Sequence, residues 1–139
     1  MAPAQADTKK TFESLTKMLK EGGYKSTIDE KIPAHVLLFE GKGGRKFEFF
    51  IGAVDDILIM TSVIASADQV TRTPTLDTAL LKANFEYGFY KIIFDQKGNL
   101  IFRYDIYENM VDAADLKKLI KDMVDNTNNV YDGAPFIKK

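Results

Sequence analysis

The feature that most constrains the fold is a run of three strand-like segments, 35–40, 46–54 and 57–65, separated by short turns. The turns are the glycine-rich sequence 41–44 and the aspartate pair 55–56. Short segments rich in Phe, Ile, Leu and Val are typical of strands, and turns of this length join neighbouring antiparallel strands. The sequence therefore predicts a three-stranded antiparallel meander.

A second group of strands follows later in the chain. Residues 90–94 and 100–107 are rich in aromatic and β-branched side chains, and the polar sequence 95–99 separates them. Gly98 can adopt the positive φ that a tight turn requires. This group predicts a hairpin, which brings the expected number of strands to five.

Three segments show the apolar spacing of amphipathic helices. They are residues 8–21, a segment that begins at Pro74 and ends near Asn84, and a last segment that Asp112 caps and that weakens from Asn126 onward. The element order is α-β-β-β-α-β-β-α. This order predicts an α+β fold in which helices cover one face of a five-stranded antiparallel sheet.

The length of the chain fits one domain. With 139 residues, 45% of them apolar, it can bury a core of its own without disulfides or metals. We expect a flexible N-terminal tail over residues 1–7, a single α+β domain over 8–135, and a C-terminal tail over 136–139.

The composition excludes several kinds of site. The chain has no cysteine and a single histidine, His35, so it cannot form a disulfide, a thiolate metal site or a multi-histidine metal site. The loop 41–44 lacks the spacing of a phosphate-binding loop and precedes a strand, while Asp55, Asp56 and Asp95 occupy turns that favour aspartate for local hydrogen bonds. No nucleophile–base pair can be assembled from the sequence. We therefore expect no metal, no cofactor and no enzymatic activity.

Charge and hydropathy indicate which partners and compartments to expect. The net charge of −1 leaves no basic excess for a nucleic acid, and no apolar run reaches the roughly 20 residues of a membrane helix. A cytoplasmic protein is favoured. The sequence Ala4-Gln5-Ala6 would instead fit the end of a signal peptide, in which case the protein is exported to the periplasm.

The strands of the meander carry apolar side chains on both faces. In a half-solvated antiparallel sheet one face should be polar, so a helix or another chain must cover the second face. Counting alternate positions places one set of three side chains opposite Phe49 and Ile59. We expect that set to bind a partner protein: Phe50, Leu58 and Met60.

The chain resembles the bacterial YbjN-like and type III secretion chaperone-like (Tir chaperone) superfamily. The resemblance is carried by residues 80–84 (Leu-Leu-Lys-Ala-Asn), by the hairpin 89–100 and by the closing helix 116–130. The element order extends it over nearly the whole chain. Secretion chaperones of this kind are acidic, whereas this chain is nearly neutral, which favours the broader YbjN-like group.

This resemblance implies a non-catalytic homodimer that holds an extended segment of a partner protein on its sheet, with strand addition at an edge as a further mode of binding. Similar proteins dimerise through the helix that begins at Pro74. In this chain the apolar stripe of that helix is small enough for close approach, and the expected dimer interface is Leu76, Ala79, Leu80 and Ala83.

A small-molecule-binding domain is the alternative. In that case an aromatic-lined cavity would lie between the sheet and the helices. The side chains expected to line it are Phe47, Phe49, Phe102 and Tyr104.

Overall fold

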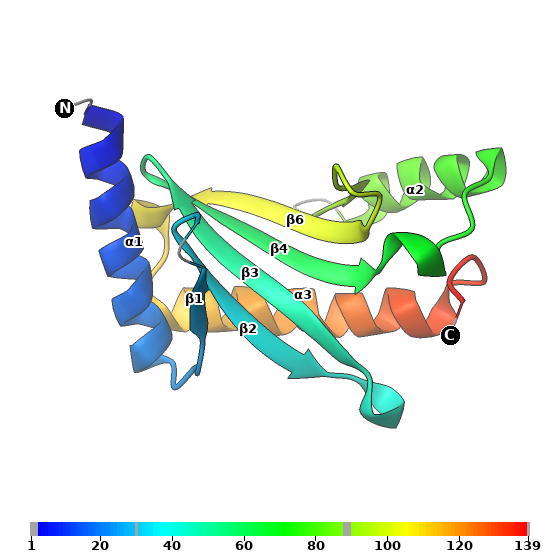
Figure 1. Ribbon diagram of the computed structural model, residues 1–139, viewed down its shortest axis with the longest axis horizontal. Helices are drawn as coiled ribbons and strands as arrows, with labels where there is room; N and C mark the ends of the chain where they lie inside the picture. Colours follow the sequence, from blue (N-terminus) through cyan, green and yellow to red (C-terminus); the bar gives the residue numbers. More distant parts are fainter. Residues whose placement is uncertain (1–2, 30, 88–89, 139) are drawn as a thin grey trace.

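The computed structural model describes residues 3–29, 31–87 and 90–138. Within them, three α-helices pack with one antiparallel sheet, which confirms the α+β class (Figure 1). In chain order the helices and strands are α1 (Pro3–Glu21), β1 (Thr27–Asp29), β2 (Ala34–Glu40), β3 (Lys46–Val54), β4 (Ile57–Ala65), α2 (Pro74–Tyr87), β5 (Lys91–Phe94), β6 (Leu100–Tyr107) and α3 (Ala113–Gly133).

The sheet has six strands in the order β1-β2-β3-β4-β6-β5, not the five expected from the sequence. The added strand is β1, whose three residues pair with Ala34–Val36 of β2. A three-residue strand is too short to show the alternation that identifies longer strands, so the sequence pattern does not indicate it.

Helices α1 and α3 pack on the same face of the sheet (Figure 1). Helix α1 contacts β3 and β4, and α3 runs along β4 and also contacts α1. Helix α2 lies at the opposite end from α1 and packs against the edge strand β5. The strands between these helices have one covered face and one face without a helix, and this asymmetry defines the functional surface described below.

The apolar core lies between the sheet and α1 and α3. Among the described residues, twelve large side chains are fully buried there. Helices α1 and α3 contribute the i, i+3 and i+4 positions that the spacing predicts, and the strands contribute alternate positions. The twelve residues are Phe49, Phe102, Leu15, Leu19, Ile51, Leu58, Met60, Ile64, Leu100, Leu116, Ile120 and Met123.

Two turns between strands use left-handed backbone conformations, and the sequence predicts the one at Gly98. Asp55 has φ of 54° in the turn between β3 and β4, a left-handed conformation that aspartate tolerates better than most residues. Gly98 has φ of 85° in the turn between β5 and β6, and the backbone N–H of Gly98 donates to the carbonyl of Asp95 at 3.0 Å.

Several element ends differ from the expectations. Helix α1 begins at Pro3, so residues 3–7 are helical where we expected a tail, and these include Ala4-Gln5-Ala6. Helix α3 continues to Gly133 through the asparagine-rich stretch. Thr127 explains that continuation in part, because its buried hydroxyl hydrogen-bonds that of Ser62 on β4 at 2.6 Å.

The expected C-terminal tail also has structure, because Ile137 is buried and bridges Val70. Residues 1–2 and 139 of the expected tails, and Phe89 of the expected hairpin, lie outside the described residues.

Candidate protein-binding surface

The face of the sheet that α1 and α3 leave uncovered carries a band of apolar side chains. Cross-strand partners lie on the same face of a sheet, and the pairs Val36–Phe50 and Val54–Ile57 lie opposite the face that holds Phe49. We call this the open sheet face. Its large apolar members on β2, β3 and β4 are each exposed or half-buried, and they are Val36, Leu38, Phe50, Val54, Ile57, Ile59 and Val63.

Of the three side chains that the sequence predicts for partner binding, the structure places only Phe50 on the open sheet face. Leu58 and Met60 have no exposed surface and belong to the core beneath the helices. Their cross-strand partners are Ala53 and Ile51, whereas Phe50 pairs with Thr61. The expectation that the three share a face is therefore wrong, because it took even-numbered residues of β3 and even-numbered residues of β4 to lie on the same face.

A shallow hollow of about 250 Å³ lies on the open sheet face beside Phe50. Gly52 contributes to it because no side chain fills the space between Phe50 and Val54. Its lining is almost entirely apolar and includes Ile59 from β4 and Ile32 from the turn before β2. We call this the Phe50 hollow. Its size and character suit one apolar side chain of a bound segment.

Charged groups of both signs lie on the open sheet face. Glu40 lies directly across from Lys46 in the β2–β3 register. On β6, Arg103 donates to both carboxylate oxygens of Asp105, at 3.0 and 3.1 Å. A face with internally balanced charge and an apolar band favours an uncharged, apolar partner segment over a charged one.

The two edges of the sheet differ in their accessibility to another strand. At the β5 edge, the side-chain amide of Asn84 on α2 donates to the carbonyl of Ile92 at 3.0 Å and accepts from its N–H at 2.6 Å. Asn84 thus takes the position of a neighbouring strand. At the other edge β1 pairs only with Ala34–Val36, so in the described sheet the end of β2 at Glu40 has β3 alone as its strand partner. Strand addition is therefore easier at β2 than at β5.

The inward side of α2 holds two of the residues expected at a dimer interface. Leu76 and Leu80 are buried within the same chain and belong to its core. Ala79 is exposed, and Ala83 is half-buried and packs against the core. The outward side instead presents Leu81, Phe85 and other exposed residues.

Leu81 and Phe85 are 74% and 91% exposed and lie one turn apart on α2. The dimer expectation took the inward stripe of α2 for an outward one, since apolar spacing alone does not say which neighbour a stripe contacts. The signal missed in the sequence was that Leu81 and Phe85 form a second apolar stripe at i, i+4.

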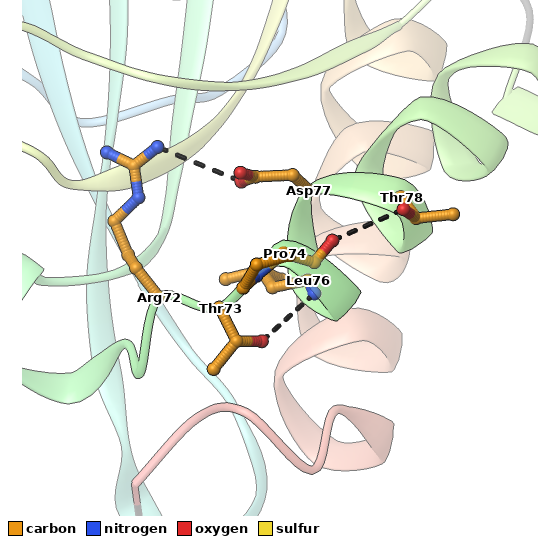
Figure 2. A network of polar contacts seen from close by, with 6 residues as sticks. All are labelled: Arg72, Thr73, Pro74, Leu76, Asp77 and Thr78. Carbon is orange, nitrogen blue, oxygen red and sulfur yellow. Dashed lines mark hydrogen bonds and ion pairs between the residues drawn. The ribbon is translucent and has the colours of Figure 1, made fainter.

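The start of α2 is fixed by polar contacts (Figure 2). The Thr73 hydroxyl accepts from the N–H of Leu76 at 3.2 Å, as expected of a threonine cap before Pro74. Arg72 lies 3.8 Å from the Asp77 carboxylate, and its guanidinium stacks over the Phe94 ring at 4.0 Å from the centroid. The contact between Arg72 and Phe94 joins the start of α2 to β5.

The four aromatic residues expected to line a cavity lie on the covered face of the sheet and pack as part of the core. Phe49 and Phe102 are fully buried, and Phe47 is nearly so. Strand β4 separates the two β3 aromatics from Phe102 and Tyr104 on β6, so the four residues do not line one common space.

His35 is buried under α1 between two hydroxyl groups. Its Nε2 lies 2.8 Å from the Thr16 hydroxyl and its Nδ1 lies 2.7 Å from the Ser26 hydroxyl, while Phe12 stacks on the ring at 4.9 Å between centroids. Burial lowers the pKa of His35 below its ordinary value of 6.5. No carboxylate takes part in these contacts, and the arrangement ties α1 to β2. Among the described residues, no cluster of three His, Asp or Glu side chains could hold a metal ion.

No protein-family model matches this chain, and a search of curated proteins finds no match. Solved structures do match it. One is the complex of ExsC with ExsE, at 13% sequence identity and a TM-score of 0.69, where the match covers 92% of this chain and 96% of the other.

A second is the Yersinia pestis type III secretion chaperone SycH bound to a stable fragment of YscM2, at 11% identity and a TM-score of 0.62. It covers 86% of this chain and 98% of the other. The third is YbjN from E. coli, at 12% identity, a TM-score of 0.63, and coverage of 86% and 87%.

This chain has the type III secretion chaperone fold. The match confirms the resemblance to secretion chaperones and YbjN, since the similarity extends over most of each chain. At these identities it is the fold that is shared. In the described part of the chain, no helix combines the length and the apolar character needed to cross a bilayer.

Proposed function

We propose that this protein is a non-catalytic, chaperone-like module that holds an extended segment of a partner protein on its open sheet face. The observation that carries this proposal is the apolar band around the Phe50 hollow, which the chain's own helices leave uncovered. Ile32, Leu38 and Val54 are each more than half exposed there, and neighbouring exposed apolar side chains are characteristic of a protein-binding site.

Chaperones of the same fold support the proposal. The solved SycH structure contains a fragment of a second protein, and ExsC was solved in complex with ExsE. In this chain we expect an apolar, extended segment, because the open sheet face carries charges of both signs and, in the described sheet, no further strand pairs with the end of β2. The cytoplasm is the compartment we favour.

A selection from a random peptide library tests this function, because the library presents many different segments to the open sheet face at once. We expect the purified chain to enrich uncharged peptides with apolar residues at alternate positions. Phe50→Asp places a carboxylate at the edge of the Phe50 hollow, and we expect it to weaken the binding of the selected peptides at least tenfold, about 1.4 kcal/mol.

The matched control for that selection is Glu48→Gln, which changes a neighbouring residue on the same face without filling or charging the hollow. Selected peptides should bind this variant as they bind the original chain. Enrichment of peptides that bind the Phe50→Asp and Glu48→Gln chains equally would place the binding elsewhere and would contradict the proposal.

We also propose that the protein is a homodimer and that the outward side of α2 forms the interface. Leu81 and Phe85 leave most of their apolar surface in water. Burying a side chain of this size contributes on the order of 1.5–3 kcal/mol, and a twofold axis would bury both residues of each protomer. The expected interface therefore moves from Leu76 and Leu80 to Leu81 and Phe85.

Light scattering over a wide concentration range measures the mass directly. We expect twice the chain mass of 15.7 kDa, and a monomer for the variant Leu81→Ser/Phe85→Ser. Lys82→Ala, an exposed change on the same helix, is the control and should leave the dimer intact. A dimer that persists in the double variant would show that another surface forms the interface.

A further inference from the structure

Residues 135–138 lie along the chain's own segment 69–71 in the manner of an added strand. The N–H of Thr71 donates to the carbonyl of Phe136 at 3.0 Å, and the N–H of Lys138 donates to the carbonyl of Gln69 at 2.7 Å. Between these two hydrogen bonds, Val70 and Ile137 form an antiparallel bridge. This is the backbone geometry by which a peptide binds to a strand edge.

The side chains at the middle of this segment are more buried than those at its ends, since Pro135 and Lys138 are exposed. Ile137 is buried and belongs to the main core, while Phe136 is half-buried against it. Lys138 follows, near the exposed carboxylate of Asp68. The hydrogen bond from the Ser66 hydroxyl is the main reason that the pKa of Asp68 lies below its ordinary value, and the Lys138 ammonium lowers it further. The edge therefore accepts an aromatic, an aliphatic and a basic residue in succession.

Open hollows flank the segment. Hollows of about 330 and 440 Å³ lie beside it, and Ala79 of α2, Pro135 and Phe136 line both of them. In Figure 2 the red ribbon of the last residues passes near Thr73, which lines the larger hollow. Both hollows open to solvent, so a bound segment bulkier than the chain's own residues can gain further apolar contacts there.

We propose that the edge 69–71 is a second peptide-accepting site, which the chain's own residues 135–138 occupy, and that a partner protein binds it with an extended aromatic–aliphatic–basic segment that displaces them. The site lies apart from the Phe50 hollow, and the proposal stands or falls independently of the function proposed for the open sheet face. The chain's own segment competes with the partner and so limits access to the site.

A disulfide that fixes the segment in place and can be reduced again provides the test. Val70 and Ile137 lie opposite each other but exchange no backbone hydrogen bond, because the two hydrogen bonds join the residues on either side of them. In antiparallel strands, such non-hydrogen-bonded pairs have Cα atoms about 4.5 Å apart. This separation lies within the range of roughly 4.4–6.8 Å that a disulfide spans. The chain contains no cysteine, so Val70→Cys/Ile137→Cys forms one defined bond, which mass spectrometry can verify.

The probe is a fluorescently labelled peptide, Gly-Ala-Pro-Phe-Ile-Lys-Lys, which reproduces residues 133–139. We expect the reduced Val70→Cys/Ile137→Cys chain to bind it at least about tenfold more tightly than the oxidised chain, because the disulfide keeps the chain's own segment at high effective concentration. A peptide with Lys138→Glu should bind about two- to fivefold more weakly, because Asp68 then meets a like charge.

A second variant covers the case in which the cysteine pair fails to fold or to oxidise. Phe136→Ala/Ile137→Ala weakens the chain's own segment, and this variant should bind the peptide at least about tenfold more tightly than the unaltered chain. Equal binding by oxidised and reduced chains, or no binding by a folded variant at about 1 mM peptide, would overturn the proposal.

Discussion

At the residue scale, the single histidine shows how two hydroxyl groups fix a buried ring. The Thr16 hydroxyl donates its proton to the carbonyl of Phe12 at 2.9 Å, so it can only accept from His35. Nε2 of His35 is therefore the protonated nitrogen, and Nδ1 accepts from Ser26. The neutral tautomer satisfies all three groups.

This arrangement predicts that acid destabilises the fold through His35. Because burial lowers the pKa of His35 in the folded chain below 6.5, the unfolded chain binds a proton first as the pH falls. The free energy of unfolding should decrease from about pH 6.5 down to the lowered pKa, by up to about 1.4 kcal/mol per pH unit. Urea unfolding between pH 8 and pH 5 measures this decrease.

His35→Gln serves as the control for that titration because it retains polar contacts without a group that titrates in the same range. The difference between the two pH profiles isolates the histidine from the carboxylates. Parallel profiles would show that burial of His35 contributes nothing to the pH dependence.

Leu58 and Met60 lie on the opposite face from the one expected, and the length of the turn between β3 and β4 explains why. Two residues, Asp55 and Asp56, separate Val54 from Ile57, and a two-residue turn makes those flanking residues cross-strand partners. Even-numbered residues of β3 then share a face with odd-numbered residues of β4. Phe50 could therefore have been grouped with Ile59 from the turn length alone.

At the scale of elements, Asn84 links α2 to the edge of the sheet, and its removal should be costly. Asn84→Ala leaves the N–H and carbonyl of Ile92 without the side-chain partner that the structure gives them. We expect a loss of about 1–3 kcal/mol in the free energy of unfolding, even though alanine favours the helix.

Urea unfolding measures this loss, with Lys82→Ala on the same helix as the matched control. That exposed change should alter stability by less than about 0.5 kcal/mol. If the two alanine variants unfold at the same urea concentration, Asn84 does not support β5.

Elements with clear periodicity could be predicted from the sequence, and elements held by distant contacts could not. The caps of α2 and α3 and the longer strands follow from local patterns. The short strand β1 forms because β2 offers an edge to it. The last turns of α3 persist in part because Thr127 bonds to β4. The spacing of apolar residues in one sequence does not indicate contacts between distant segments.

At the scale of the whole molecule, the placement of the helices determines what the protein can bind. Helices α1 and α3 both cover one face of the sheet, and α2 lies at the β5 edge with Leu81 and Phe85 directed outward. Two apolar surfaces thus remain uncovered, one on the sheet and one on α2. The sequence predicts apolar residues in excess of one core, but alternation and helical spacing alone assigned several of them to the wrong side.

The central claim is that the Phe50 hollow receives a side chain of a partner segment, and filling the hollow tests it most directly. A Cβ at Gly52 would lie 3.4 Å from the Pro33 carbonyl oxygen and 3.6 Å from the Ala34 Cβ, and Gly52 lacks the positive φ that favours glycine. Gly52→Val should therefore fold, and valine suits a strand.

The measurement is a fluorescence-anisotropy titration of a selected peptide against the unaltered chain and the Gly52→Val variant, with thermal unfolding of both to confirm the fold. We predict at least a tenfold loss of affinity in the variant, about 1.4 kcal/mol, with an unchanged or higher melting temperature. Equal affinity of the two folded chains would contradict the account, because the peptide would then bind without entering the hollow.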